Sequence, residues 1–396
     1  MAGNFNDLGD TIETLALDTT RFTKEAPGRI IPIDGGNHSF VPLPLPPKWE
    51  FPTRLWPLLS EAKQQLGILE GIGRTLPNPG ILLRPLEDRE AIRSSKLEGT
   101  YVTARELLLF EIKPREARSE GDAANDQREV LNYRQALAQG LNSNLPLSLR
   151  LLRELHATLL TGVRGRDRSP GEFRRVQVAT GTNHRFIPPP PQLLMECLDA
   201  LEKYFYIRDC PYDPLVNCFL IHYQFETIHP FSDGNGRVGR LLLAIMLKDC
   251  CGFSKPWLYM SEYFEKHHDE YVQKLFNVSA SAAWESWIEF CLQGTLSQAT
   301  DTIRRCDMLC KIREDFARRT TAVGGAVRLT QIVEDIFHSP FVRVADLPER
   351  LNVTYPTAKA DVDRLVQAGI LKELENITPK TFYAPEVFNV AYEELD

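Results

Sequence analysis

The sequence predicts a mainly α-helical protein with one small β-hairpin and a C-terminal region of short helices. Three observations predict this class. Strand-like alternation is confined to residues 172–187 and to the tail of the chain. After a Gly-Gly pair at residues 324–325, the pattern changes to a short helix, a turn and a second helix. Elsewhere apolar residues recur at helical spacing, first at Leu55, Leu58, Leu59, Ala62, Leu66 and Leu69.

Composition indicates an ordinary globular protein. The 396 residues, 43% hydrophobic and 25% charged, suit two or three domains of about 100–200 residues. The net charge of -7 argues against a nonspecific binder of polyanions. The longest apolar run, residues 241–247, is far shorter than the ~20 residues of a membrane span. The eight cysteines form no Cys-x-x-Cys pair and residues 1–7 do not resemble a secretory signal, so we expect a cytoplasmic protein with reduced thiols and no membrane partner.

The elements follow in order along the chain. Residues 1–50 are expected to be extended and to wrap over a larger body, because prolines 42, 44, 46 and 47 block a helix. Ser169-Pro170-Gly171 marks a turn, and the apolar residues of 172–187 around Gly181 predict a hairpin that ends at prolines 188–191. A linker is expected at 320–326. Apolar periodicity predicts helices at 54–75, 87–98, 102–113, 122–140, 147–162, 214–228, 236–250, 261–275, 282–293 and 297–319.

The stretch from His229 to Arg240 carries the strongest chemical signal. Pro230 ends the preceding helix, and the small residues after it form a loop. Glycines at 234 and 236 permit positive φ and expose backbone N–H groups. The next helix starts at once, so its first N–H groups and its positive dipole end face the loop. This arrangement predicts an anion site.

Charged side chains of this stretch suit a polyphosphate. Arg237 and Arg240 are three residues apart, so they share a helix face, and arginine forks match phosphate oxygens. Asp233 is a natural Mg²⁺ ligand beside phosphates. His229 at the loop mouth can take a proton near neutral pH. Together they predict nucleotidyl or phosphoryl transfer; the alternative is a simple helix–loop–helix turn with surface arginines.

The stretch His229-Pro230-Phe231-Ser232-Asp233-Gly234-Asn235-Gly236-Arg237-Val238-Gly239-Arg240 resembles the signature of Fic-domain proteins, with every position present. The resemblance implies a protein adenylyltransferase that moves AMP from ATP to a Ser, Thr or Tyr hydroxyl of a target protein. It implies that His229 is the base and that Asp233 holds Mg²⁺. The nucleotide-binding residues that it implies are Gly234, Asn235, Gly236, Arg237, Val238, Gly239 and Arg240.

An upstream segment resembles the inhibitory motif of the same family. Ser94-Ser95-Lys96-Leu97-Glu98-Gly99 matches Ser/Thr-x-x-x-Glu-Gly/Asn, and Ser94 and Glu98 share a helix face. A carboxylate at a helix C-terminus is disfavoured by about 0.3–1 kcal/mol, so a cation is expected to compensate. The resemblance implies that Glu98 pairs with Arg240 and blocks the productive pose of the γ-phosphate. The alternative is an exposed Glu at a frayed helix end.

Two further segments are similar to Fic proteins. The hairpin at 172–187 lies where the family carries its target-docking flap, although residues 178–181 lack the Trp-Ile-Gly of many relatives. The aromatic stretch 257–271 is similar to the segment that packs the adenine, which implies contacts from Tyr263 and Tyr271. These tyrosines are eight residues apart and are expected on one side of a helix; the alternative is a core aromatic stripe.

The C-terminal region resembles a winged helix. Residues 344–351 and 355–365 predict the two helices of a helix-turn-helix, and Gly369 leads into the wing. From residue 329 onward there are six Lys and Arg against twelve Asp and Glu, a net charge of -6. This acidity argues against nucleic acid as a partner and favours an intramolecular or protein contact.

We therefore predict three parts: an N-terminal wrap with the inhibitory helix (1–110), a Fic catalytic core (111–320) and a winged-helix module (329–396). The predicted function is Mg²⁺-dependent protein adenylylation from ATP, held back by Glu98, with self-modification included. Two alternatives stay open: removal of AMP from a modified protein, and a DNA-binding regulator with a vestigial Fic core. The target protein and the oligomeric state, a homodimer included, are left open.

Overall fold

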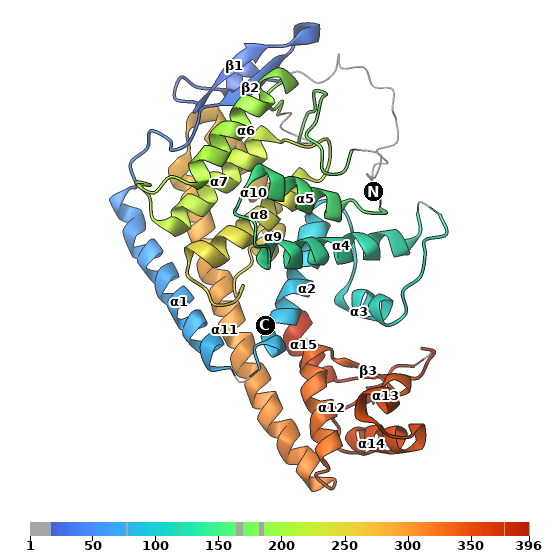
Figure 1. The fold of residues 1–396 in the computed structure, drawn as a ribbon. Helices are drawn as coiled ribbons and strands as arrows, with labels where there is room; N and C mark the ends of the chain where they lie inside the picture. The colour runs from blue at the N-terminus through green and yellow to red at the C-terminus, as the bar shows by residue number, and fades with distance from the viewer. Residues whose placement is uncertain are drawn as a thin grey trace. The chain divides into compact units, whose positions relative to one another are not determined.

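The computed structural model describes residues 17–76, 78–119, 121–163, 169–181, 186–375 and 377–395. The described chain is mainly helical with two small sheets, which confirms the predicted fold class (Figure 1). It divides into two compact units, each built from three segments. The first unit lies within Met1–Ala62, Gln135–Gly252 and Tyr263–Thr295, and the second within Lys63–Arg134, Phe253–Glu262 and Leu296–Asp396.

The first unit is centred on helices α7 (Pro214–Ile228) and α8 (Asn235–Cys250), which pack against each other. Helix α7 has buried side chains on all sides, as expected of a helix in the middle of a core. Gly239 allows the close approach, because a Cβ there would lie 2.1 Å from Glu226 Oε1. Around this pair lie α5 (Leu149–Leu159), α6 (Pro191–Phe205) and α10 (His268–Ser281).

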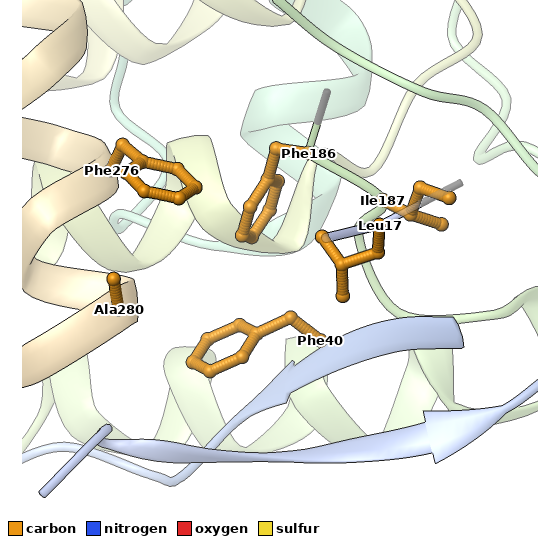
Figure 2. Close-up of a cluster of buried hydrophobic side chains, with 6 residues drawn as sticks. All are labelled: Leu17, Phe40, Phe186, Ile187, Phe276 and Ala280. Carbon is orange, nitrogen blue, oxygen red and sulfur yellow. The ribbon is translucent and has the colours of Figure 1, made fainter. Parts of the chain in front are cut away.

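A two-stranded hairpin lies in the segment that was expected to be extended and irregular. Strands β1 (Gly28–Pro32) and β2 (His38–Pro42) pair antiparallel, with Ile30 opposite Phe40. The backbone N–H of Phe40 donates to Ile187 O at 2.9 Å. Figure 2 shows the side chains of one buried cluster pointing into the space between this hairpin and α10. The cluster consists of Leu17, Phe40, Phe186, Ile187, Phe276 and Ala280.

We predict that Phe40→Ala will destabilise the first unit by about 3–5 kcal/mol. The Phe40 ring is fully buried and contacts Phe22 and Phe186, so truncation leaves a cavity between the hairpin and α10. Leu43→Ala is the matched control, since Leu43 is 55% exposed and its loss should change the free energy of unfolding by less than about 0.5 kcal/mol. Denaturant unfolding monitored by circular dichroism measures both. Equal midpoints for the two variants would contradict the role of this cluster.

In the described part of the hairpin expected at residues 172–187, the structure has one antiparallel bridge. Thr180 and Phe186 exchange two backbone hydrogen bonds, of 2.8 and 3.0 Å. Residues 182–185, at the expected tip, lie outside the described residues, and so do residues 1–16 of the expected N-terminal wrap. The β1–β2 hairpin is therefore the regular two-stranded ladder in the described part of this unit.

The second unit contains helices α2 (Gly80–Leu97), α3 (Ala104–Ile112) and α12 (Val327–His338). Helices α13 (Leu347–Leu351) and α14 (Tyr355–Gln367) lie in the two segments that were expected to form a helix-turn-helix. A three-stranded antiparallel sheet follows the order β3 (Phe341–Arg343), β5 (Thr381–Tyr383), β4 (Lys372–Glu373), and α15 (Pro385–Tyr392) follows it. Leu108 of α3 shares a buried cluster with the C-terminal elements, namely Phe341, Leu374, Phe388, Ala391 and Tyr392.

Four helices have residues in both units: α1 (Trp56–Thr75), α4 (Ala123–Leu141), α9 (Ser261–Lys266) and α11 (Trp284–Ala322). Helix α11 is one helix of 39 residues, where the sequence predicted two (Figure 1). The single helix predicted at 261–275 is instead broken at His267, whose φ of -115° and ψ of 38° separate α9 from α10. Tyr263 and Tyr271 therefore lie on two different helices.

Candidate active site

The site is built on the turn between α7 and α8, and His229 forms the end of α7. Its backbone is left-handed (φ 52°, ψ 62°), and its N–H still donates to Phe225 O at 3.0 Å. Such a conformation costs a non-glycine residue about 1–3 kcal/mol and persists only where the surroundings hold it. The half-buried imidazole lies with Nδ1 3.3 Å from Glu226 O. Because a carbonyl only accepts, Nδ1 carries the proton and Nε2 is the nitrogen that can accept one.

The loop after His229 is closed by Asn235. Its side-chain oxygen accepts from Phe231 N and its amide donates to Phe231 O, both at 2.8 Å. Gly234 has the left-handed conformation (φ 76°) at the N-cap of α8, while Gly236 lies inside the helix. The sequence therefore predicted the loop and the start of α8, and it missed that the amide of Asn235 shapes the loop.

The first two turns of α8 combine the positive end of the helix with two arginines. The first N–H groups of a helix have no acceptor within the helix, so the first turn of α8 is suited to bind an anion. Arg237 and Arg240 are both buried, and Arg237 Nη2 lies 3.8 Å from Asp233 Oδ1. Val238, predicted to bind the nucleotide, lies in the core with no exposed surface, and its N–H donates to Gly234 O at 3.0 Å.

Asp233 is the residue that fits a magnesium ion. Its side chain is 45% exposed, and its Oδ1 accepts from Gly234 N at 2.6 Å, which fixes the carboxylate at the loop surface. Mg²⁺ is usually held by one or two carboxylates together with phosphate oxygens and water. Among the described residues, no group of three His, Cys, Asp or Glu side chains forms a metal site made of protein alone. A single carboxylate beside an anion site suits a magnesium ion that binds together with the phosphates of a nucleotide.

Two residues that sequence reasoning missed hold the loop from outside the motif. Arg174, which is buried, donates through Nε to His229 O at 2.8 Å and through Nη2 to Ile228 O at 3.4 Å. Its own N–H donates to Pro230 O at 2.9 Å. Burial lowers the pKa of Arg174 to about 10, and the cation faces the last carbonyls of α7, where the helix dipole favours it.

The second missed residue is His156 on α5, which has no exposed surface. Its ring stacks on Phe231 with centroids 3.8 Å apart, and its Nε2 lies 3.0 Å from Asp233 O. Burial lowers the pKa of His156 to about 4, so the imidazole is neutral at physiological pH. The spacing of leucines predicted the helix that became α5, but nothing in the sequence linked this helix to the loop.

The two tyrosines assigned to the adenine lie in an aromatic cluster of the first unit. Tyr271 is buried, stacks on Phe264 and has its hydroxyl 2.9 Å from His222 Nε2. Burial, with a smaller effect of Arg240, lowers the pKa of His222 to about 3. Tyr263 is 9% exposed and packs against His267 and Phe290. Both tyrosines are core residues in this structure, and Tyr263 has the larger exposed edge.

The predicted inhibitory residues belong to the second unit. Helix α2 ends at Leu97, Glu98 is its C-cap, and Gly99 follows with φ 87°, as the sequence indicated. Ser94 is fully buried, whereas Glu98 is exposed at the helix end. Arg240, the expected partner of Glu98, lies in the first unit.

Comparisons with known proteins match the segment that contains this site. The model of the Fic/DOC family N-terminal region matches residues 56–142, and the Fic/DOC family model matches residues 146–247, which include the whole α7–α8 turn. The chain therefore contains a Fic/DOC N-terminal region at residues 56–142 and a Fic/DOC domain at residues 146–247.

The chain is also similar to curated and solved proteins. It is 29% identical to a protein adenylyltransferase Fic of Aedes aegypti over 182 residues, which are 45% of this chain and 35% of the relative. It is 32% identical to the Drosophila grimshawi enzyme over 132 residues, 32% of this chain and 26% of that protein. The chain thus matches about a third or less of these relatives' length.

Two solved structures share the fold. A Fic family protein from Desulfovibrio desulfuricans G20 has a TM-score of 0.54 at 17% identity, covering 86% of this chain and 98% of that one. Fic-1 of C. elegans has a TM-score of 0.51 at 20% identity, covering 63% and 74%. Among the described residues, no helix has both the length and the apolar character that crossing a bilayer requires.

Proposed function

We propose that the protein is a protein adenylyltransferase that transfers AMP from ATP to a hydroxyl side chain of a target protein, itself included. The observation that carries the proposal is the arrangement of the α7–α8 turn. It sets an imidazole with an accepting Nε2 beside the positive end of a helix that also carries two arginines. The similarity to enzymes with this name supports the same activity.

In the proposed reaction, the target hydroxyl gives its proton to His229 Nε2 as its oxygen bonds to the α-phosphorus of ATP. The bond from the α-phosphorus to the bridging oxygen breaks, and pyrophosphate leaves in line. His229 suits this task because its ring is held by Glu226 O through Nδ1 and its backbone by Arg174. Positioning of this kind supplies a large part of the rate.

The anionic side of the reaction would be held by α8. The N–H groups of its first turn and the guanidinium of Arg237 would bind phosphate oxygens, and Arg240 would bind the γ-phosphate. Asp233 would hold Mg²⁺, which neutralises charge on the phosphates when bound. Burial of both arginines keeps water away from the cations and strengthens their attraction for phosphate.

Transfer of label from ATP tests the reaction type. The protein is incubated with ATP labelled at either the α- or the γ-phosphate, with Mg²⁺, and the protein-bound label is measured. Adenylylation predicts that only the α-label is retained on the protein. Retention of the γ-label would instead indicate phosphorylation and overturn the proposal, and so would label retained from neither position when target proteins from a cell extract are supplied.

We also propose that the C-terminal module acts within the chain, on the inhibitory helix. Arg343 donates to Ile112 O of α3 at 2.8 Å, and Tyr392 donates its hydroxyl to Asp88 of α2 at 2.9 Å. On α14, Lys359 pairs with Asp363, and Arg364 lies 3.7 Å from Asp361. The helix that a winged helix would offer to DNA thus has cations matched by its own acids, which supports a protein contact instead.

We predict that Tyr392→Phe will lower the free energy of unfolding by about 1–3 kcal/mol and raise basal AMP transfer. The change removes a donor from Asp88, a fully buried carboxylate on α2, the helix whose C-cap is Glu98. Tyr355→Phe is the matched control, because Tyr355 is 50% exposed on α14. Thermal unfolding and α-label transfer are measured for both. Lower stability without any rise in AMP transfer would show that the module supports the fold and takes no part in the inhibition by Glu98.

A further inference from the structure

His156 connects three parts of the site although it lies outside the signature. It comes from α5, stacks on Phe231, and reaches the backbone of Asp233 on one side and of Gly171 on the other. A Cβ added at Gly234 would lie 3.6 Å from His156 Cδ2, so the loop rests directly on this ring. A ring with no exposed surface in this place cannot touch the substrate.

The hydrogen bonds of His156 fix which ring nitrogen carries the proton. Gly171 N–H donates to Nδ1 at 2.8 Å, so Nδ1 is the acceptor. Nε2 then carries the hydrogen and donates to Asp233 O at 3.0 Å. Each nitrogen has a partner of the right kind, and exchanging the two roles would set one N–H against another.

The two partners of His156 lead to the two reactive residues of the loop. Asp233 carries the carboxylate that suits Mg²⁺. Gly171 lies three residues before Arg174, whose guanidinium binds the carbonyl of His229. His156 therefore joins the segment that holds the base to the residue that would hold the metal.

We infer that His156 is a positioning residue that sets the orientation of Asp233 toward magnesium–ATP through the bond from Nε2 to the Asp233 carbonyl. The inference rests on the proposed function. Residues that orient a metal ligand commonly change metal affinity by about 10- to 100-fold when they are replaced. Loss of the Nε2 donor should therefore raise the magnesium requirement while the loop, closed by Asn235, stays folded.

Two variants separate this role from simple support of the fold. The side-chain amide of His156→Gln can place a donor near the position of Nε2, and that of His156→Asn can place an acceptor near Nδ1. Both lose the stacked ring, so a purely structural role predicts the same loss for both. The positioning role predicts that the magnesium requirement of His156→Gln stays within about threefold of the wild-type value. The magnesium requirement of His156→Asn should rise by about tenfold or more.

The experiment measures ATP binding by calorimetry over a range of Mg²⁺ concentrations, together with α-label transfer, for the wild type and both variants. Equal magnesium requirements for the two variants would overturn the inference. ATP binding with magnesium but without any transfer in the wild type would refute the proposed function, and the comparison of binding would still decide the role of His156.

The tautomer of His156 gives a readout that does not depend on activity. Long-range ¹H–¹⁵N spectra of histidine-labelled protein at neutral pH should show a ring protonated at Nε2 and bare at Nδ1, assigned by its loss in His156→Gln. The opposite tautomer would remove the donor to Asp233 and refute the inference, whatever the kinetics.

Discussion

Replacing His229 with Ala is expected to lower AMP transfer by about 100- to 10,000-fold. In the proposed reaction the imidazole takes the proton of the attacking hydroxyl, and general base catalysis usually contributes that much. ATP binding should persist, because the phosphate-binding groups lie on α8, after the loop. Transfer of α-label and calorimetric binding of ATP, measured on the same preparation, test both parts.

The control for this variant is His268→Ala. His268 is another histidine of the first unit, and its side chain is 51% exposed at the start of α10. Its loss should leave transfer unchanged. If His229→Ala retained more than about a tenth of wild-type transfer, the imidazole would not be the base, and the mechanism proposed for the loop would have to be abandoned.

Replacing Glu98 with Gly is expected to raise both self-modification and target modification, by about 10- to 100-fold. A charge-assisted hydrogen bond of about 1.5–3 kcal/mol to Arg240 would hold back the productive nucleotide pose by this factor. The exposed C-cap position of Glu98 means that the substitution costs little stability, and glycine tolerates a helix end well. Initial rates of α-label transfer, with and without added target, measure the effect.

Glu116→Gly serves as the control, because Glu116 is a 90% exposed carboxylate of the same unit and the charge change is identical. It should leave the rate within about twofold of wild type. Equal rates for wild type and Glu98→Gly would refute the inhibitory role of Glu98. They would not affect the catalytic role proposed for His229. A rise in both variants would point to a general effect of charge.

Most helices could be predicted because their apolar residues recur with the helical period. Errors arose where local signals competed with packing. Helix α6 was missed because it begins directly after a run of prolines, yet Pro191 occupies the first helical position, where proline is tolerated. Its buried residues Leu194, Leu198 and Leu201 did carry the pattern. Helix α11 continues through Gly294, whose cost of about 1 kcal/mol is offset by buried neighbours such as Cys291 and Thr295.

The β1–β2 hairpin was missed for a different reason. Its strands are short and are flanked by prolines. Prolines favour an extended backbone but do not indicate which segment the strand pairs with. Pairing depends on contacts far along the sequence, such as the one between Phe40 and Ile187. Such long-range contacts leave no local pattern in the chain.

The candidate reactive residues could be recognised together because they are contiguous in the sequence. His229, Asp233, Asn235 and Arg237 place an imidazole, a carboxylate and the start of a helix within nine consecutive residues. The structure has a turn between α7 and α8 at this point. His156 and Arg174 could not be found in this way, because their roles arise from partners 77 and 55 residues away. Asn235 was expected among the nucleotide-binding residues, and the structure adds that both polar atoms of its side chain bond the backbone of Phe231.

A crystal structure of the Glu98→Gly variant, bound to magnesium and a non-hydrolysable ATP analogue, tests the mechanism proposed for the α7–α8 turn. We expect phosphate oxygens at the first turn of α8, the metal on Asp233, and the His229 ring facing the α-phosphorus from the side opposite the leaving group. A nucleotide bound elsewhere, or at this loop with the His229 ring turned away from the α-phosphorus, would contradict it.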